Sequence, residues 1–353
     1  MQKIKVGIIG TGNIAQQHAN SYHLLDNVEI AACCDLNLER AKAFAEKNHI
    51  ASVYGSFEEM LEKEKELIAV SVTTWNNAHM PASIAALNAG KHVLVEKPMA
   101  MNAEEGRKMK EAAEKNGKLL MVGFVRRFDV KTDIAKEYIA SGEVGDIYYA
   151  KTKCIRRCGN PLGWFADKSL SGGGPLIDLG VHMIDLARYL MGKPRAVSAY
   201  GVTAKKIGPM ENIKHHHRYL AYSAGTGACD VEDFATAIVR FENGAALHVE
   251  VSFSGHIAKD ELSLEILGDK GGMTINPELG FYTVKHDHLV DETPRFTVPQ
   301  DPFSNIFALE INHFIDCIQN GTPCRNTADD GIALMEILDA VYKSAELGRE
   351  VVI

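Results

Sequence analysis

Residues 4–15 read IKVGIIGTGNIA, and this stretch decides the fold. The apolar run Ile4–Ile9 predicts a buried strand, and the glycine turn after it opens a predicted helix over Asn13–Leu25. Gly10 allows a tight turn, Gly12 lets a backbone approach a pyrophosphate, and the small Ala15 lets helix and strand pack closely. The stretch therefore predicts the first strand, turn and helix of a dinucleotide-binding domain.

The start of this helix and the end of the next strand supply the polar groups for a dinucleotide. Asn13 and Ile14 stand where unpaired backbone amides meet phosphates. Asp35 follows the predicted strand Val28–Cys34, where its carboxylate can bind both ribose hydroxyls and would repel a 2′-phosphate, which favours NAD over NADP. Asp35 can also cap the helix that follows it, and Arg40 is close enough in the sequence to weaken the repulsion of a phosphate.

The first part of the chain alternates strands with helices. Its apolar runs are short and lack polar alternation, as in strands of a parallel sheet that helices cover on both faces. The further strands expected are Leu67–Val72, His92–Val95 and Leu119–Gly123, and the further helices are Asn37–Asn48, Pro81–Ala89 and Asn102–Asn116. We expect residues 1–124 to form an α/β domain of the Rossmann type.

The remainder, residues 125–353, has longer runs with alternating polarity, which predict an α+β domain with a large, mostly antiparallel open sheet. Two helices, roughly Asn305–Gln319 and Asp329–Leu347, are expected after the strands. The expected strands are Ile147–Cys154, Ala196–Val202, Phe234–Phe241, Ala245–Phe253, Leu262–Leu267 and Met273–Ile275.

Composition excludes several classes of function. The chain has 353 residues and a net charge of -8, so it has no basic surface for nucleic acid, and its apolar runs are too short to cross a membrane. Seven irregularly spaced cysteines and the lack of a secretory signal predict a cytoplasmic protein. No metal site is expected, because neither His215–His217 nor Cys154 with Cys158 has the spacing of a ligand set.

Two segments carry side chains suited to chemistry. Lys97, in Glu96-Lys97-Pro98, follows a predicted strand and can stabilise an alkoxide, although a lysine in such a turn can also simply be solvated. Asp178 and His182 are four residues apart and share one face of a helix, so the imidazole can exchange a proton beside a carboxylate. Asp185 is a second candidate partner of His182. The alternative is that His182 has no catalytic role and only caps the end of its own helix.

Five segments together resemble the Gfo/Idh/MocA oxidoreductases, a family that includes glucose-fructose oxidoreductase and inositol dehydrogenases. These segments are GTGNIA, TTWNNAH at residues 73–79, EKP at 96–98, GFVRRFD at 123–129 and GWFADKSLSGGGPLIDLGVHMIDL at 163–186. The resemblance implies that Lys97 acts at the reacting carbon, that His182 accepts the proton, and that Asp178 anchors substrate. It also implies a homodimer or homotetramer that pairs through the open sheet.

The resemblance further implies a set of binding residues. Thr74, Asn76, His79 and Glu96 line the dinucleotide, and Arg127, Asn160 and Trp164 shape a sugar pocket. In the first run Trp75 stands where the family has proline, so its indole either stacks on a ring near the cofactor or covers the loop.

The sequence thus predicts an NAD(P)-dependent dehydrogenase of carbohydrate metabolism that oxidises a secondary hydroxyl of a sugar or cyclic polyol. Two alternatives remain open at this point. One is a redox-neutral glycoside hydrolase or eliminase that retains NAD, and the other is a non-catalytic regulator that senses the dinucleotide. The sequence leaves the identity and phosphorylation of the substrate open.

Overall fold

The computed structural model describes residues 3–210, 213–214, 219–221 and 229–353, so the histidine run His215–His217 lies outside the described residues. The chain divides into two compact units, Met1–Val125 with Pro299–Ile332, and Arg126–Val298 with Ala333–Ile353. The segment Pro299–Ile332 groups with the first unit, whereas the sequence pattern assigns it to the second domain.

The first unit is built on a six-stranded parallel sheet with strand order β3-β2-β1-β4-β5-β6. The strands are β1 (Ile4–Ile9), β2 (Val28–Cys34), β3 (Ser52–Tyr54), β4 (Ala69–Val72), β5 (His92–Val95) and β6 (Leu120–Val122). The order reverses between β1 and β4, and ligands of open parallel sheets bind at the carboxyl ends of the strands near such a point. The expected Rossmann fold is confirmed.

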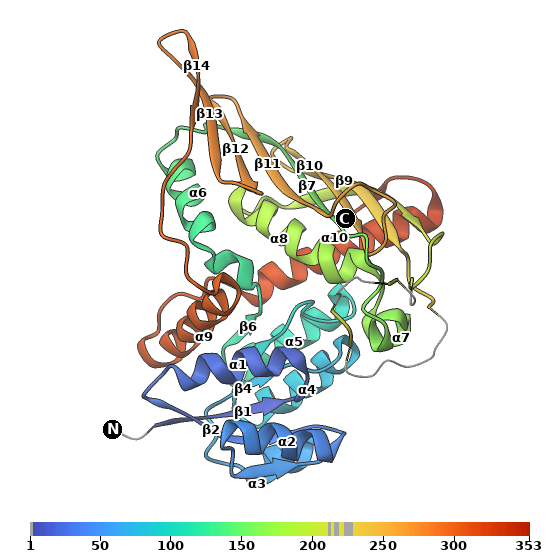
Figure 1. Cartoon of the computed structure of the whole chain (residues 1–353). Helices are drawn as coiled ribbons and strands as arrows, with labels where there is room; N and C mark the ends of the chain where they lie inside the picture. Colours follow the sequence, from blue (N-terminus) through green and yellow to red (C-terminus); the bar gives the residue numbers. More distant parts are fainter. Residues whose placement is uncertain (1–2, 211–212, 215–218, 222–228) are drawn as a thin grey trace. The chain divides into compact units, whose positions relative to one another are not determined.

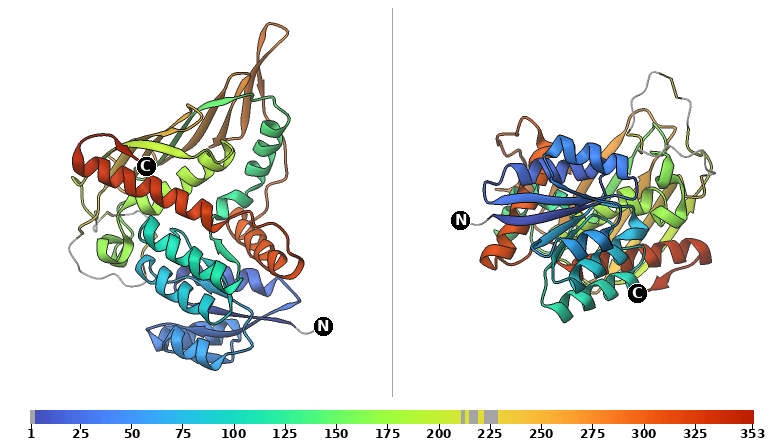
Figure 2. Two further views of the ribbon diagram at one scale, coloured as in Figure 1. Left: turned by 180° about the vertical axis from the view of Figure 1, so that it is seen from behind. Right: turned by 90° about the horizontal axis from the view of Figure 1, so that it is seen from below.

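Helices cover both faces of this sheet, with α1 and α2 on one face and α4 and α5 on the other (Figures 1 and 2). The helices of the unit are α1 (Asn13–His23), α2 (Leu38–Asn48), α3 (Phe57–Lys63), α4 (Asn76–Asn88), α5 (Ala103–Asn116) and α9 (Pro302–Asn320). Asn102 caps α5 by accepting a hydrogen bond from the amide of Glu105, as its sequence predicts. Helix α9 packs against α1.

The second unit contains a nine-stranded sheet in the order β14-β13-β12-β11-β7-β10-β9-β8-β15. Neighbouring strands are antiparallel except β7 and β10, which are parallel. The strands are β7 (Ile147–Ile155), β8 (Ala196–Ala204), β9 (Phe234–Phe241), β10 (Ala246–Ser252), β11 (Glu261–Gly268), β12 (Gly271–Asn276), β13 (Gly280–Lys285), β14 (His288–Glu292) and β15 (Val351–Val352). The mostly antiparallel sheet expected from the sequence is confirmed.

Helices α6 (Val130–Ala140) and α8 (Val181–Leu190) pack against this sheet, and Figure 1 shows them along it. A π-helical turn, Leu176–Gly180, leads directly into α8, and short helical segments are Val125–Phe128, Gly163–Ala166 and α7 (Lys168–Ser171). Helix α10 (Ala328–Leu347) contacts β8, where the Ser344 hydroxyl accepts a hydrogen bond from the Gly201 amide. Among the described residues, no helix combines the length and apolar character needed to span a bilayer.

Candidate active site

The two glycines of the turn after β1 differ in what they do. The backbone conformation requires glycine at position 10, whereas Gly12 leaves open space beside the backbone. Gly10 has φ +89°, and a Cβ on it would lie 2.9 Å from the backbone of Thr73. Gly12 has φ −75°, and a Cβ there would meet nothing within 4 Å. No side chain caps the start of α1. The amides of this helix start and the open space over Gly12 fit a pyrophosphate.

Asp35 lies beside this turn with an ionised carboxylate. Its oxygens accept hydrogen bonds from the amide and hydroxyl of Thr11, at 2.8 and 3.0 Å, and from the amide of Asn37 at 2.8 Å. Arg40 binds both oxygens, at 2.7 and 3.2 Å. Burial opposes ionisation, but the hydrogen bonds from Arg40, Thr11 and Asn37 outweigh it and lower the pKa of Asp35. The helix cap of α2 is Asn37, so Asp35 itself does not cap it.

The loop after β4 is held against the loop after β5. Trp75 precedes the first residue of α4 and is half-buried, and Asn76 is buried at the helix start. The His79 ring lies with Nδ1 2.7 Å from the Pro98 carbonyl and Nε2 3.1 Å from the Thr74 carbonyl. Burial lowers the pKa of His79, so the neutral ring donates to one of these carbonyls. This histidine therefore fixes the position of the two loops.

Glu96 lies at one end of a buried series of side chains that are joined by hydrogen bonds. One of its oxygens lies 2.9 Å from Nε2 of His18, whose Nδ1 lies 3.0 Å from the Ser71 hydroxyl, and Tyr22 binds the same hydroxyl at 2.8 Å. Burial opposes ionisation of Glu96, but the contact with His18 and the charge of Lys97 outweigh it and lower the pKa of the carboxyl group. Glu96 is thus turned into the unit and holds the start of the loop.

Lys97 differs from its neighbours in exposure. Between Val93 and Ala100, every residue is buried except Lys97. Its backbone amide donates to the Glu96 carboxylate at 3.2 Å. The lysine therefore follows β5 at the same edge of the sheet as the glycine turn, Asp35 and Thr74, and it is the residue of its segment that solvent reaches.

In the second unit, Asp178 and His182 are likewise more exposed to solvent than their neighbours along the chain. From Gly173 to Leu190, only these two residues are partly exposed. Asp178 lies in the π-helical turn, where its amide bonds to the Gly174 carbonyl at 3.1 Å, and His182 lies in the first turn of α8. A π-turn inside a helix is frequent at functional sites.

A partly buried acid holds the glycine run that precedes this turn, and sequence reasoning missed it. The Glu232 carboxylate accepts the amides of Gly174 and Leu176, at 2.9 and 3.1 Å, and the Tyr342 hydroxyl at 2.9 Å. Burial raises the pKa of Glu232. A Cβ on Gly173 would lie 2.0 Å from the Tyr342 hydroxyl, so glycine is required there. No motif in the sequence connects Glu232 with residues so far along the chain.

The residues expected to shape a sugar pocket have structural contacts of their own. Arg127 is 0% exposed and binds both oxygens of Asp185, at 2.6 and 3.0 Å, with its guanidinium over the ring of Tyr189. Asp185, which the sequence offers as a second candidate partner of His182, thus binds Arg127. Asn160 is 3% exposed and forms a hydrogen bond within its own loop, whereas Trp164 is partly exposed and its ring packs in a tilted arrangement against Phe165. Of these residues, Trp164 has surface to offer a ligand.

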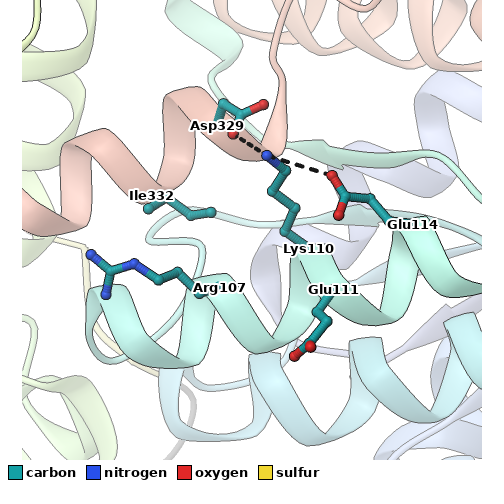
Figure 3. Close-up of a pocket in the computed structure, with 6 residues that line it drawn as sticks. All are labelled: Arg107, Lys110, Glu111, Glu114, Asp329 and Ile332. Atoms are coloured by element: carbon teal, nitrogen blue, oxygen red, sulfur yellow. Dashed lines mark hydrogen bonds and ion pairs between the residues drawn. The ribbon is translucent and has the colours of Figure 1, made fainter.

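A surface hollow of the first unit lies between α5 and the start of α10 (Figure 3). Lys110 at its centre pairs with Asp329 at 2.5 Å and with Glu114 at 3.5 Å. Lys110, Glu114 and Asp329 are thus paired with one another, and none of the residues that line the hollow comes from the strand ends that carry the candidate site.

Comparisons with known proteins agree with the geometry. A family model described as an oxidoreductase family with an NAD-binding Rossmann fold matches residues 4–124, and its C-terminal alpha/beta domain model matches residues 136–353. The chain is 35% identical to the D-glucoside 3-dehydrogenase of Escherichia coli (strain K12), with 99% of this chain and 97% of that protein covered. It is 29% identical to the scyllo-inositol 2-dehydrogenase (NAD(+)) of Bacillus subtilis (strain 168), with 99% and 96% covered.

Solved structures give the same result. The structure of a levoglucosan dehydrogenase in complex with NADH matches with a TM-score of 0.87 and 25% identity, and covers 100% of this chain and 99% of that one. The expected NAD cofactor and the class of oxidoreductases that act on hydroxyl groups of sugars and polyols are confirmed.

Proposed function

The chain belongs to the Gfo/Idh/MocA oxidoreductase family, and from this membership we propose that it oxidises a ring secondary hydroxyl of a pyranoside sugar, with the 3-hydroxyl of a glucoside as the first candidate. The D-glucoside 3-dehydrogenase, at 35% identity over almost the whole chain, supports this choice. The observation that carries the proposal is the row of polar residues at the carboxyl edge of the parallel sheet, which ends in the partly exposed Lys97.

The first unit holds the cofactor in this proposal. The amides of Asn13 and Ile14 bind the pyrophosphate over Gly12, and Asp35 binds the adenosine ribose. Thr74, Trp75, Asn76 and His79 border the dinucleotide, and Glu96 fixes the loop that carries Lys97. When bound, NAD supplies the acceptor for the hydride that leaves the substrate carbon.

Lys97 and His182 have different roles at the substrate hydroxyl. His182 accepts its proton, and the ammonium group of Lys97 stabilises the oxygen as negative charge develops on it. Asp178 binds a neighbouring hydroxyl and orients the imidazole. The exposure of these three side chains within otherwise buried segments supports the assignment, because a group that meets substrate must reach solvent in the free protein.

The setting of the reaction is also part of the proposal. We place the enzyme in the cytoplasm, because all seven cysteines are thiols and not disulfides, and four of them are partly exposed. We also propose a homo-oligomer that pairs through the outer face of the nine-stranded sheet.

A substrate panel tests the activity. The purified protein is incubated with NAD⁺, and separately with NADP⁺, and with methyl glucosides, levoglucosan, inositols and glucose 6-phosphate, while the absorbance of reduced nicotinamide is recorded. The expected result is reduction of NAD⁺ with a glucoside, and a 3-keto product identified by NMR. Product formation from a glycoside without net change in absorbance would instead favour the redox-neutral alternative, and no reaction with any pyranoside or cyclitol would contradict the proposal.

Replacing Lys97 tests its role. Lys97→Met keeps the length of the side chain but removes the charge, so we expect kcat to fall by about 10²–10³, the loss typical of one oxyanion donor. NAD affinity, measured by calorimetry, is expected to stay within a few-fold of that of the parent. Lys115→Met, at the surface of α5, is the matched control and should leave kcat unchanged. Turnover of Lys97→Met close to that of the parent would show that the lysine has another role.

A further inference from the structure

Three metal-ligating side chains gather at the end of α9 in the first unit, and none of them belongs to the motifs that carry the proposed function. His313 and Cys317 are four residues apart on the helix, so they share one face, and Cys324 follows in the next loop. One ligand atom from each of the three lies within 4.8 Å of the others. All three residues are partly exposed, so an ion can reach them from solvent.

Contacts made by the loop after α9 hold Cys324 near the helix without a metal ion. Helix α9 ends at Gly321 with φ +68°, which turns the chain back along the helix. Thr322 then donates to Asp316, and the amide of Arg325 lies 2.9 Å from Nε2 of His313. The Asn326 carbonyl accepts the amide of Val122 in β6 at 3.1 Å. The loop is therefore anchored at several points, and Cys324 does not depend on a metal for its position.

We propose that His313, Cys317 and Cys324 bind one Zn²⁺ ion, with water as the fourth ligand. Two thiolates and an imidazole are a ligand set for Zn²⁺ and are poor ligands for Mg²⁺ or Ca²⁺. Zn–S and Zn–N bonds of about 2.3 and 2.0 Å place sulfur and nitrogen about 3.5 Å apart in a tetrahedral site. Cys317 Sγ and His313 Nε2 are 3.4 Å apart.

Binding changes the protonation of the cluster in a defined way. Both thiols release a proton to solvent, and two thiolates balance the charge of the ion. Nε2 of His313 passes from the Arg325 amide to the metal, so this hydrogen bond is lost when the ion binds. The site joins α9 to the loop that reaches β6, and α9 packs on the helix after the glycine turn, so we expect Zn²⁺ to stabilise the first unit. This site departs from the sequence-based expectation of no metal.

A titration of the full chain tests the site. The protein is reduced, dialysed against a chelator and titrated with Zn²⁺ in competition with a chromophoric chelator. The expected result is one tight equivalent, a raised Tm, and with Cd²⁺ the ultraviolet charge-transfer band of a metal thiolate. Cys324→Ala and His313→Gln are each expected to weaken binding by more than about a hundredfold. Cys324 lies in a loop, so its variant is expected to fold, and circular dichroism checks this.

Matched controls separate this cluster from other binding. Cys229→Ser removes a partly exposed cysteine outside the cluster, and replacing His215, His216 and His217 with glutamine removes the other run of candidate ligands. Both control variants should retain the tight equivalent. The proposal is overturned if the reduced parent binds no Zn²⁺, if the equivalent survives both cluster variants, or if it disappears with the histidine run instead. None of these readouts depends on turnover, so the result is independent of the proposed dehydrogenase activity.

Discussion

Gly10 and Gly12 are two residues apart, but the structure requires glycine at the first position only. The backbone of Gly10 has a positive φ and passes within 2.9 Å of Thr73 where a Cβ would lie. The backbone of Gly12 suits any residue, and the space beside it is open. The fold therefore does not require glycine at position 12, which supports our proposal that the pyrophosphate of the cofactor lies there.

This difference predicts opposite effects for two equivalent substitutions. Gly12→Ala should leave the free energy of unfolding within about 0.5 kcal/mol of the parent and weaken NAD binding at least about tenfold, or ~1.4 kcal/mol. Gly10→Ala should destabilise the protein by at least about 2 kcal/mol, because strain at positive φ adds to the contact with Thr73. Chemical denaturation and calorimetry with NAD measure the two quantities. Unchanged NAD affinity in Gly12→Ala would contradict the pyrophosphate site.

Only some residues of the site can be recognised in the sequence. The glycine turn and Asp35 are visible because each follows a predicted strand, and Arg40 is visible because it lies close to Asp35 along the chain. The pairs Glu96 with His18 and Arg127 with Asp185 join residues far apart in the sequence, so no spacing rule reveals them. The family resemblance implies that Arg127 shapes a sugar pocket, and the structure shows its guanidinium buried against Asp185.

At the scale of elements, the strands and helices with strong patterns were predicted and the weak ones were missed. β1, β2, β5 and β9 have the predicted bounds. The three residues of β3 and the seven of α3 are too short to show a period. The hairpin β13–β14 is mostly exposed, so it lacks the apolar alternation on which prediction depends. Helix α4 begins at Asn76 and contains Pro81, whereas the proline itself suggested a start at residue 81.

The π-helical turn before α8 depends on Glu232 and Tyr342, and this dependence can be tested. Glu232→Ala leaves the amides of Gly174 and Leu176 and the Tyr342 hydroxyl without their acceptor, so we expect a loss of about 2–4 kcal/mol of stability. Because the turn carries Asp178, kcat should fall more than the substrate KM changes.

Graded variants distinguish positioning from simple destabilisation. Tyr342→Phe removes one of the three donors and should cost about 1 kcal/mol with little effect on kcat. Glu232→Gln keeps one acceptor oxygen and should recover part of the turnover. Kinetics are measured well below the Tm of each variant. If kcat of Glu232→Ala equals that of the parent once the protein is folded, Glu232 has no role in holding the turn for catalysis.

At the scale of the whole molecule, one face of the nine-stranded sheet remains without helices of its own chain among the described residues. Helices α6, α8 and α10 pack on one side, as the contact of Gly201 with α10 shows. Large apolar and aromatic residues on the other side are exposed, namely Tyr200, Val202, Ile238, Leu267, Tyr282, Val284 and Leu289. A face of this kind, on several adjacent strands, marks an interaction surface.

A second copy of the chain is the partner that we predict for this face. An isologous pairing of two sheets buries the same residues on both protomers. A substitution that adds a charge to this face therefore places the same charge on both sides of the interface. Ile238→Lys combined with Val284→Lys should therefore convert the dimer or tetramer into a monomer, as measured by light scattering coupled to size exclusion, without changing circular dichroism. Leu24→Lys, an equally exposed apolar position at the end of α1, is the control and should leave the mass unchanged. A parent protein that is monomeric at micromolar concentration, or a double variant that still assembles, would mean that this face binds something else.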